Sequence, residues 1–522
     1  MIQKKQVLFS LLLVSISISA APIKTKTDTK DKKITKAKHS KPKHSSDSNT
    51  DSTQGFEAVY TPTAQVGTSP GDLDGSFGRQ GLKSSQLDLG GSSIYDIAVN
   101  TQGKIFTAGR SENNEHFIVT GYTDNGQIDP EFGYNGNGTN IVIFGDTYEP
   151  CGANALAIDN TNPANRGKLV VAGYSGNNFG VARYLSNGEF DCTFNSGSSF
   201  PGRNTIVFGL PTKKGSTAKS SAHDLAVGSD GSVVMAGETI NSATGKKVLS
   251  LGKVREDGKT ETSFGANGTV MFSLSERFPG IVTPTAIETI EGIGTQTVTE
   301  AGRNIPYTVT AGTTEVFNTQ QQGGGSRTQG YIARFNPQGE FNANFGPNGN
   351  GLVLVNYSAA GFSVASPSSL HDTIIDSENR IVVVGNVQDR DGFDVISIAR
   401  YLSNGSPDTS FNGTGVQTVP FNRDAEGLSV AFDQLNRILI TGVATTDNNG
   451  TQEQVVVRLL PDGTIDRNFG TNGLVVTDFD NPSQNSAGRG IIFQPTKNRI
   501  IAAGYNNNAN GEPYSALAGY RS

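Results

Sequence analysis

The chain has 522 residues with 42 basic and 48 acidic side chains, and it contains 64 glycines but no tryptophan. The formal net charge of −6 is unevenly divided, because residues 1–51 carry +7 and leave −13 for the remainder. An acidic body disfavours specific nucleic-acid binding by that part of the chain. The lack of tryptophan argues against a sugar site built on indole stacking, a role that tyrosine and phenylalanine can also fill.

Residues 1–21 have the three parts of a secretory signal peptide. Lys4 and Lys5 precede an apolar run at residues 7–18, and small residues follow at positions 19–21. The run is shorter than the roughly 20 apolar residues that cross a bilayer comfortably. We therefore expect a cleaved signal rather than an anchor, no transmembrane segment in the mature chain, and a secreted or periplasmic protein.

Residues 22–70 are expected to form a disordered basic tail and linker. The first part of this segment carries nine lysines among serine, threonine and aspartate, with no hydrophobic pattern. Such a composition buries too little apolar surface to offset the entropy lost on ordering. The alternative to a solvated tether is a basic arm that touches anionic lipid, polysaccharide or nucleic acid through loose electrostatics.

From residue 71 onward one turn motif returns seven times, beginning as "GDLDGSFGRQG". Its copies are 55 to 81 residues apart, so the unit is constant and its connections vary in length. The phenylalanine common to all copies stands at Phe77, Phe132, Phe194, Phe264, Phe345, Phe411 and Phe469. A period of this size is typical of a propeller or a repeat array.

Between turn motifs the sequence alternates short apolar and polar runs, the pattern of half-buried strands. A second landmark is an apolar strand closed by glycine, such as "GKIFTAG" and "GKLVVAG", which also occurs seven times. Its residues are apolar on both faces, as expected for a strand between two packed sheets. No segment outside the signal shows a sustained helical period.

The two ends of the repeat region predict a closed ring. The chain stops at "ALAGYRS", where another turn motif is due, and the region begins at Gly71 with that missing piece. The strand at 82–89 can therefore complete the last sheet beside residues 515–521, and closure removes exposed sheet edges. We predict an all-β fold over residues 71–522, a seven-bladed β-propeller of four-stranded blades.

The motif "LDGSFG" followed by "DIAV" and "GKIFTAG" resembles the delta-60 repeat, a bacterial propeller-type repeat of similar length. The resemblance covers residues 71–522, and the fourth copy departs from it with Glu261 in place of aspartate. The resemblance implies the fold and implies no enzymatic activity or ligand.

The residues of the turn motif point to structure more than to chemistry. The phenylalanine is expected to fill the seam between blades, and the motif's aspartate to bind turn amides rather than a metal. These aspartates are Asp74, Asp129, Asp191, Asp408 and Asp466. Cys192 lies inside one turn motif, and it can form a disulfide with Cys151 in an oxidising compartment.

Three strands carry a Tyr–Asp or His–Asp pair in the same position. The candidate catalytic residues are Tyr95, His223, Asp224, His371 and Asp372, with Asp96 completing the first pair. The first strand of a propeller blade lines the central channel, so these groups are expected near one mouth. They could bind a polar ligand or metal or move a proton; the alternative is a structural His–Asp hydrogen bond.

Two further features are weaker candidates for a functional site. The segment "DRDGFD" spaces Asp389, Asp391 and Asp394 as in a calcium loop, but it lacks the closing glutamate, which favours a solvated hairpin. The fourth repeat has insertions at 291–304 and 313–330, which we expect to extend its loops. These loops are either a recognition surface or a tolerated low-complexity expansion.

Catalytic signatures such as GxSxG, HExxH and the phosphate-binding loop are absent from the sequence. We expect an exported, non-catalytic propeller, monomeric and without a cofactor, that binds a protein or an extracellular glycan through loops on one face. The alternatives are a hydrolase or lyase with its site at the channel mouth, and an envelope-attached protein held by its basic arm.

Overall fold

The computed structural model divides the chain into two compact units, Met1–Gly55 and Phe56–Ser522. The signal peptide expected at residues 1–21, and most of the tail expected at 22–70, lie outside the described residues. The structure describes residues 64–85, 92–111, 116–134, 136–145, 149–209, 220–240, 246–284, 286–318, 325–421, 423–479 and 484–522.

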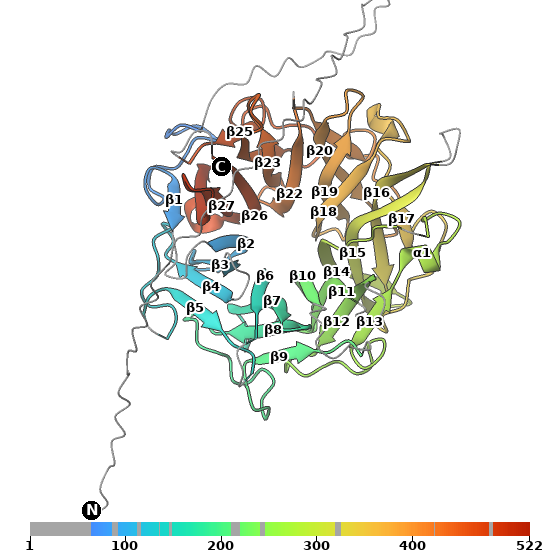
Figure 1. Cartoon of the computed structure of the whole chain (residues 1–522), viewed down its shortest axis with the longest axis horizontal. Helices are drawn as coiled ribbons and strands as arrows, with labels where there is room; N and C mark the ends of the chain where they lie inside the picture. Colours follow the sequence, from blue (N-terminus) through green and yellow to red (C-terminus); the bar gives the residue numbers. More distant parts are fainter. Residues whose placement is uncertain are drawn as a thin grey trace, which may run out of the picture. The chain divides into compact units, whose positions relative to one another are not determined.

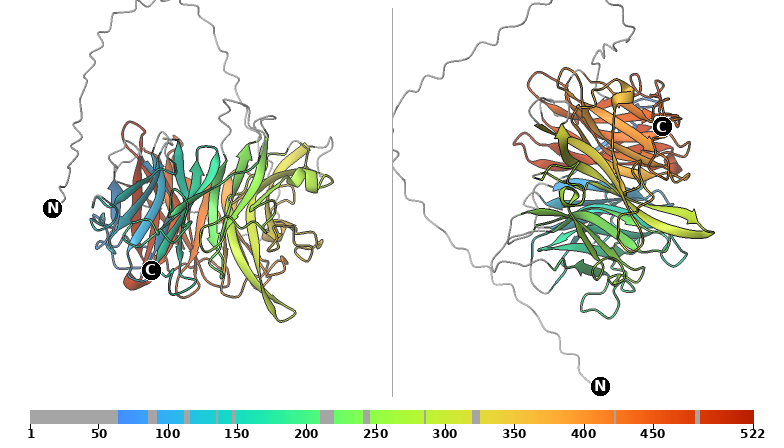
Figure 2. Two further views of the ribbon diagram at one scale, coloured as in Figure 1. Left: turned by 90° about the horizontal axis from the view of Figure 1, so that it is seen from below. Right: turned by 90° about the vertical axis from the view of Figure 1, so that its right-hand side faces the viewer.

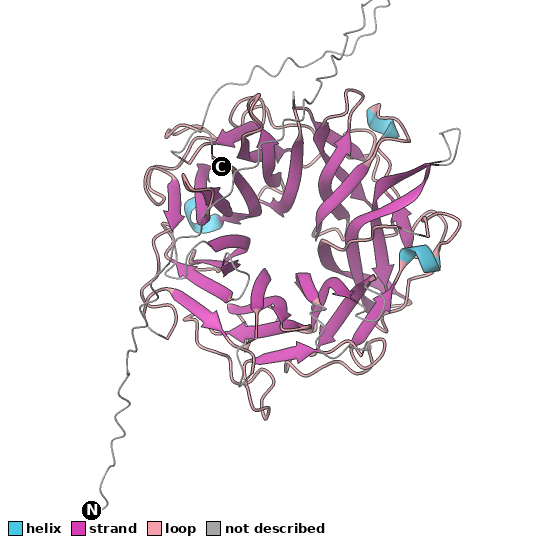
Figure 3. Ribbon diagram, in the orientation of Figure 1, coloured by secondary structure: helices cyan, strands magenta, loops and turns pink. Residues whose placement is uncertain are grey.

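The second unit is a ring of seven antiparallel sheets with four strands each (Figure 1). This confirms the predicted seven-bladed β-propeller. Strands account for nearly all regular structure (Figure 3), and the short helical segments are α1 (Leu274–Arg277), η1 (Ser358–Ala360) and η2 (Pro495–Lys497).

The seven blades are numbered here in chain order, and their strands are given from the inner to the outer edge. Blades 1 to 3 are β2 (Ser92–Val99), β3 (Ile105–Ser111), β4 (Phe117–Tyr122), β5 (Thr139–Val142); β6 (Cys151–Asp159), β7 (Lys168–Ser175), β8 (Asn178–Tyr184), β9 (Arg203–Ile206); and β10 (Ser221–Val227), β11 (Val233–Ile240), β12 (Lys247–Val254), β13 (Thr269–Phe272). Blades 4 and 5 are β14 (Gly292–Glu300), β15 (Arg303–Asn318), β16 (Gly325–Phe335), β17 (Leu352–Leu354); and β18 (Ser368–Ile375), β19 (Ile381–Gln388), β20 (Asp394–Tyr401), β21 (Val416–Val419). Blades 6 and 7 are β22 (Ala425–Phe432), β23 (Ile438–Thr445), β24 (Gln452–Leu459), β25 (Leu474–Thr477); and β26 (Ser486–Gln494), β27 (Arg499–Asn507), β28 (Pro513–Arg521), β1 (Leu82–Ser85).

Blade 7 joins the beginning of the propeller to its end, as the split repeat predicts. Strand β1 pairs antiparallel with β28, with Leu82 opposite Ala518 and Ser85 opposite Ser515 (Figure 1). The backbone amides and carbonyls of β28 are thus satisfied on both sides, and the ring closes through main-chain hydrogen bonds.

The propeller begins before residue 71, where the sequence placed the end of the linker. The amide of Ala64 donates to the carbonyl of Val476 in blade 6, and residues 65–67 hydrogen-bond with Leu73. This short segment has pairing partners that composition alone does not reveal, so residues 64–70 belong to the described structure rather than to a disordered tail.

The core lies between blades rather than within any one of them. The second strand of each blade is buried on both faces; in β19, for example, residues 381–387 are all buried. One apolar cluster joins Val382 and Val384 of blade 5 to Ile440 and Val455 of blade 6. Burial of apolar side chains at such seams is the main stabilising contribution to the ring.

The turn phenylalanines fill these seams at the outer part of the ring, as predicted. All seven rings are at most 1% exposed. A Cβ atom added to Gly126, in the following blade, would stand only 2.5 Å from the Phe77 ring. Each turn also donates one amide to the turn of the next blade, as from Gly78 to the carbonyl of Asn125.

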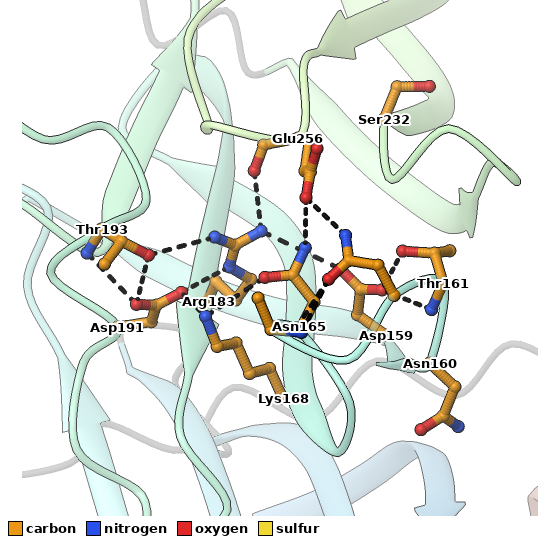
Figure 4. Close-up of polar contacts among 12 residues, drawn as sticks. Asp159, Asn160, Thr161, Asn165, Lys168, Arg183, Asp191, Thr193, Ser232 and Glu256 are labelled. Atoms are coloured by element: carbon orange, nitrogen blue, oxygen red, sulfur yellow. Dashed lines mark hydrogen bonds and ion pairs between the residues drawn. The ribbon is translucent and has the colours of Figure 1, made fainter.

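The turn aspartates bind turn amides, as expected, and four of the five also bind a buried arginine that the sequence analysis did not assign. Asp191 accepts from the amide of Thr193 at 3.1 Å through one oxygen, and from Arg183 Nε at 2.7 Å through the other (Figure 4). The guanidinium of Arg183 lies 4.7 Å from the Phe194 ring centre and also donates to the carbonyl of Glu256 in blade 3. One arginine thus connects the turn, the seam and the neighbouring blade.

The described residues of the blade 4 insertions, which exclude 319–324, form mainly strands rather than the loops expected from the sequence. Strand β15 is 16 residues long and pairs along its length with β14 and β16. The part of β15 that pairs with β16 is further held by a bridge between Val282 and Val316. At the other end of β15, the long hairpin formed by β14 and β15 projects beyond the neighbouring blades (yellow-green in Figure 2). Its threonine- and valine-rich sequence explains the difference, because these residues favour extended strands.

Candidate functional site

The inner strands of six blades carry a β-bulge near their first residues, and this bulge builds the candidate site. In β2 the pairing with β3 shifts between Ile94 and Asp96, which leaves Tyr95 as the extra residue. The same shift occurs in blades 2, 3, 5, 6 and 7. The residues at this position are Tyr95, Asn154, His223, His371, Leu428 and Arg489, and Glu291 holds the equivalent position just before β14.

The bulge also explains the glycine that recurs within the second strand of every blade. This glycine faces the carbonyl of the residue two positions before the bulged one; in blade 5, Gly385 faces Ser369. A Cβ atom on Gly385 would stand 2.0 Å from that oxygen, and the six other glycines meet the same obstacle at 1.9 to 2.2 Å. Glycine is therefore needed because two backbones approach closely, which is a common reason for glycine in a strand.

The seven residues of this bulge ring line one central cavity of about 700 Å³. The five candidate residues Tyr95, His223, Asp224, His371 and Asp372 all contribute to its wall, although they come from blades that are not adjacent. The structure thus places the predicted groups around one space, near the end of the channel where the inner strands begin.

The three aspartates after the bulge join neighbouring inner strands. Asp96 accepts from the amide of Ile97 at 2.7 Å and from Leu156, in blade 2, at 2.6 Å. The other two repeat this arrangement: Asp224 connects blades 3 and 4, and Asp372 connects blades 5 and 6. Both oxygens of each carboxylate are therefore engaged by backbone amides, and the structural alternative, a His–Asp hydrogen bond, is not what holds these residues.

Burial raises the pKa of all three inner aspartates. The pKa of Asp96 rises to about 7 and that of Asp372 to about 6, in both cases chiefly because burial disfavours the charged carboxylate. For Asp224 burial is again the main cause of the raised pKa, and the charges of Asp372 and Asp96 add to it. The amide hydrogen bonds act in the opposite direction and do not outweigh burial.

The histidines face glutamates rather than their neighbouring aspartates. His223 Nδ1 lies 2.9 Å from the carbonyl of Ile290 and 3.3 Å from Glu291 Oε2, two acceptors that place the hydrogen on Nδ1. Burial lowers the pKa of His223, but the hydrogen bond and charge of Glu291 outweigh it, so the pKa is raised. His371 Nε2 lies 3.1 Å from Asn386 Oδ1 and 3.8 Å from Glu426 Oε2.

Blades 7, 1 and 2 give the opposite side of the cavity a basic and aromatic character. The guanidinium carbons of Arg110 and Arg489 lie 4.1 and 4.4 Å from the centre of the Tyr95 ring. Arg110 Nε donates to Asn154 Oδ1 at 2.7 Å, and Asn154 in turn donates to the carbonyl of Ala222 in blade 3. The cavity is thus polarised, with Arg489 at one side and Glu291 and Glu426 at the other.

One group of side chains has the spacing of a cation site. The ligand atoms of His223, Glu238 and Glu291 lie within 4.8 Å of one another. Lys247 Nζ already lies 2.5 Å from Glu238 Oε2, so a cation would compete with this ammonium group. The donor set suits Zn²⁺ in kind, but its charge is largely balanced by protein groups.

The other candidate residues of the sequence lie elsewhere. Asp389 accepts from the amides of Asp391 and Phe393 at the tip of the β19–β20 hairpin, and the carboxylates of Asp389, Asp391 and Asp394 form no cation-sized group within the described part of the chain. The disulfide is not formed, because Cys151 is buried at the start of β6 while Cys192 is exposed in the turn after β8, at the other end of the blade.

Sequence reasoning missed Asn154, Glu291, Leu428 and Arg489 because each blade places a different residue type at the bulge. The usable signal was positional: each lies at a fixed place in the inner strand, relative to the glycine that closes the next strand.

No helix within the described residues is long and apolar enough to cross a membrane.

Comparisons with known proteins agree with the architecture. Residues 167–194, 377–411 and 436–469 match a β-propeller domain of unknown function, DUF5122. Each matched segment includes the second and third strands of a blade and ends in the turn motif. No curated protein sequence matches the chain.

Solved structures resemble the chain only distantly. A PL25 ulvan lyase is 11% identical over 84% of this chain and 96% of its own, with a TM-score of 0.42. The polysaccharide lyase Uly1 is 10% identical over 90% and 94%, with a TM-score of 0.40, and the α-L-arabinofuranosidase Arb93A from Fusarium graminearum is 9% identical over 82% and 93%, with a TM-score of 0.36. At these values the similarities carry no information about ligand or activity. What the comparisons support is a chain built from β-propeller repeats.

Proposed function

We propose that this protein is an exported binding propeller that takes a polar saccharide into the cavity at the mouth of its central channel. Export is inferred from the signal pattern of residues 1–21, and the repeats are assigned to the delta-60 type from their turn motif. The observation that carries the proposal is the bulge ring, which brings tyrosine, asparagine, histidine, glutamate and arginine to one cavity.

The size of the cavity favours a small ligand over a protein surface. Its volume of about 700 Å³ lies within the usual range of small-molecule sites, roughly 300–1,000 Å³. A stable protein partner needs about 800 Å² of contact on each side, which a concave space of this size does not offer. Small-molecule sites are mostly apolar, whereas this wall is rich in charged and amide groups, so a hydroxyl-rich ligand fits it better.

The polar groups of the wall include both donors and acceptors. The carboxylates of Glu291 and Glu426 are one-third and two-fifths exposed, so they can accept hydrogen bonds from ligand hydroxyls. On the other side Arg489, held against the Tyr95 ring, can donate, and the Tyr505 ring adds aromatic surface to the wall. A saccharide presents both kinds of polar group around an apolar ring face.

The bonding of the aspartates favours binding over catalysis. A general acid or base must hold an oxygen toward the reacting atom. Both oxygens of Asp96, Asp224 and Asp372 are instead occupied by amides of the inner strands. Their raised pKa values follow from their place in the ring and require no reaction.

The test is saccharide binding by the full-length protein, first on a glycan array and then by calorimetry with the strongest hit. Tyr95→Ala should weaken binding about tenfold because it removes the ring that holds Arg489 in the cavity wall. Tyr134→Ala is the matched control, since Tyr134 is 67% exposed in an outer turn. Its affinity should equal that of the wild type.

Two results would overturn the proposal. One is the absence of any saccharide ligand, and the other is a saccharide bound equally by wild type and Tyr95→Ala with both proteins folded. Cleavage of the bound saccharide, seen as new reducing or unsaturated ends, would instead support the hydrolase or lyase alternative.

A further inference from the structure

Arg489 differs from the other arginines buried in the propeller. Arg183, Arg400, Arg458 and Arg499 each place a guanidinium nitrogen within 2.8 Å of a turn aspartate. Arg489 stands at the bulge of β26, half-buried in the wall of the cavity. Within the part of the chain that the structure describes, its side chain has no ion pair and no hydrogen-bond acceptor.

Aromatic rings hold this guanidinium in place without satisfying its donors. Its carbon lies 4.4 Å from the centre of the Tyr95 ring and 5.3 Å from that of Tyr505. Stacking on rings fixes the plane of a guanidinium and leaves its five N–H groups available at the edge. An arginine oriented in this way, beside a cavity and without an acceptor, is suited to receive an anion.

The nearby charges favour an anion at this side of the cavity. The glutamates lie on blades 3, 4 and 6, and each has a lysine or histidine neighbour: Glu238 has Lys247, Glu291 has His223 and Glu426 has His371. The aspartates of the cavity wall, Asp96 beside Tyr95 among them, are held by backbone amides, and burial raises their pKa values, which disfavours their charge. Among the described residues of the wall, the cation without an ion-pair partner is therefore Arg489 on blade 7.

We infer that Arg489 and the two tyrosine rings form a subsite for a carboxylate or sulfate group carried by the ligand. This inference rests on the proposed function and names its ligand more closely, as an acidic saccharide. The anionic group would accept two N–H donors of Arg489 in a planar fork, while sugar hydroxyls donate to Glu291 and Glu426 across the cavity.

The main experiment compares two ligands that differ only in charge. Calorimetry with the full-length protein would use a uronic-acid oligosaccharide and the same oligosaccharide with its carboxyl groups reduced to alcohols. Arg489→Ala should weaken binding of the acidic ligand tenfold or more and binding of the neutral ligand clearly less, because only the acid uses the charge-assisted fork. Arg489→Lys keeps the charge but loses the fork. Its affinity for the acidic ligand should lie between those of the wild type and Arg489→Ala.

The matched control is Arg79→Ala, which removes an exposed arginine from an outer turn and should bind both ligands like the wild type. Melting temperatures of all variants exclude a folding defect. Equal binding of the acidic and neutral ligands by the wild type, or an acidic ligand that is insensitive to Arg489→Ala, would overturn the subsite and leave the saccharide-binding proposal intact.

A second measurement tests the subsite without any saccharide. Sodium sulfate should raise the melting temperature of the wild type above that in sodium chloride of equal ionic strength, saturably, and by more than in Arg489→Ala. The variant corrects for the general stabilising effect of sulfate. A sulfate effect that depends on Arg489, without saccharide binding, would keep the anion subsite and refute the proposed function. Identical sulfate effects in both proteins would contradict the subsite.

Discussion

Two sets of aspartates in this propeller show how the same side chain takes opposite roles. The outer set belongs to the turn motif, where Asp191 meets Arg183 and Lys168, each within 2.9 Å of its carboxylate. The inner set follows the bulge, where Asp96 meets two backbone amides and no cation. Asp96 thereby connects strands 60 residues apart in the sequence, whereas Asp191 binds cations 8 and 23 residues away.

The pKa values follow from this difference in partners. Burial raises the pKa of Asp191, but its hydrogen bonds and the charges of Lys168 and Arg183 outweigh burial and lower the pKa to about 2. At Asp96 no cation opposes burial, and the pKa rises to about 7. An outer aspartate therefore acts as one half of a charge pair, whereas an inner aspartate acts as an acceptor whose charge is disfavoured.

The largest effect is expected from breaking the outer set. Arg183→Ala leaves Asp191 with one fewer cation in a buried position and removes the packing over Phe194. We expect the free energy of unfolding to fall by about 3 kcal/mol, as for other buried pairs that lose one partner. Urea denaturation measures this change.

The matched control for this loss is Arg255→Ala, which removes an exposed arginine paired with Asp257 at 3.0 Å. Exposed pairs contribute about 0–1 kcal/mol. Equal stability of the two variants would show that the outer charge pair does not hold the turns together.

A smaller but local effect is expected from removing the bulge on which the inner set depends. Gly385→Ala forces a Cβ atom against the carbonyl of Ser369 at 2.0 Å, so the bulge at His371 must shift. We expect a loss of about 2 kcal/mol, typical of overpacking, together with weaker saccharide binding.

Gly280→Ala is the control for this substitution, because no atom lies within 4 Å of the added Cβ atom. A fully stable Gly385→Ala variant with wild-type affinity would mean that the bulge is not needed to orient the ring of side chains.

The outer turns and the inner ring also differ in how well the sequence predicted them. The turn motif and the split repeat predicted the blades and their closure because both recur with little change. The outer arginine also recurs in the sequence at one spacing. It stands eight residues before the turn aspartate at Arg183, Arg400 and Arg458. Residues of one type at one spacing leave a periodic signal.

The inner ring leaves a weaker signal. The Tyr–Asp and His–Asp pairs were found because three blades share them, and the structure places them in the wall of the central cavity. Arg489, Glu291 and Asn154 were not found, because a closed ring brings different residues together at one position and no single blade reveals the set. The amides that bind Asp96 belong to backbone, which has no sequence signature.

The smallest expected effect is the pH dependence of the stability that Asp96 and Asp191 contribute. Folding raises the pKa of Asp96, so the folded protein binds more protons than the unfolded chain between pH about 4 and about 7. The stability that Asp96 contributes should therefore decrease as pH rises through this window. Asp191 has a lowered pKa, so its contribution should decrease as pH falls from about 4 toward 2.

Chemical denaturation of Asp96→Ala and Asp191→Ala at several pH values tests these opposite trends. The destabilisation caused by Asp96→Ala should be about 1 kcal/mol smaller at pH 7.5 than at pH 4.5, a modest change because water in the cavity reduces the effect of burial. The destabilisation caused by Asp191→Ala should shrink between pH 4.5 and pH 2.5. The same pH trend in both variants would refute the distinction between the two sets.

The most direct test of the whole account is a crystal structure of the full-length protein with a saturating uronic-acid oligosaccharide. The account predicts the sugar inside the central cavity, with a carboxylate on the guanidinium of Arg489 and hydroxyls facing Glu291 and Glu426. Density for the sugar on an outer face or on the long hairpin of blade 4, with an empty cavity, would contradict it.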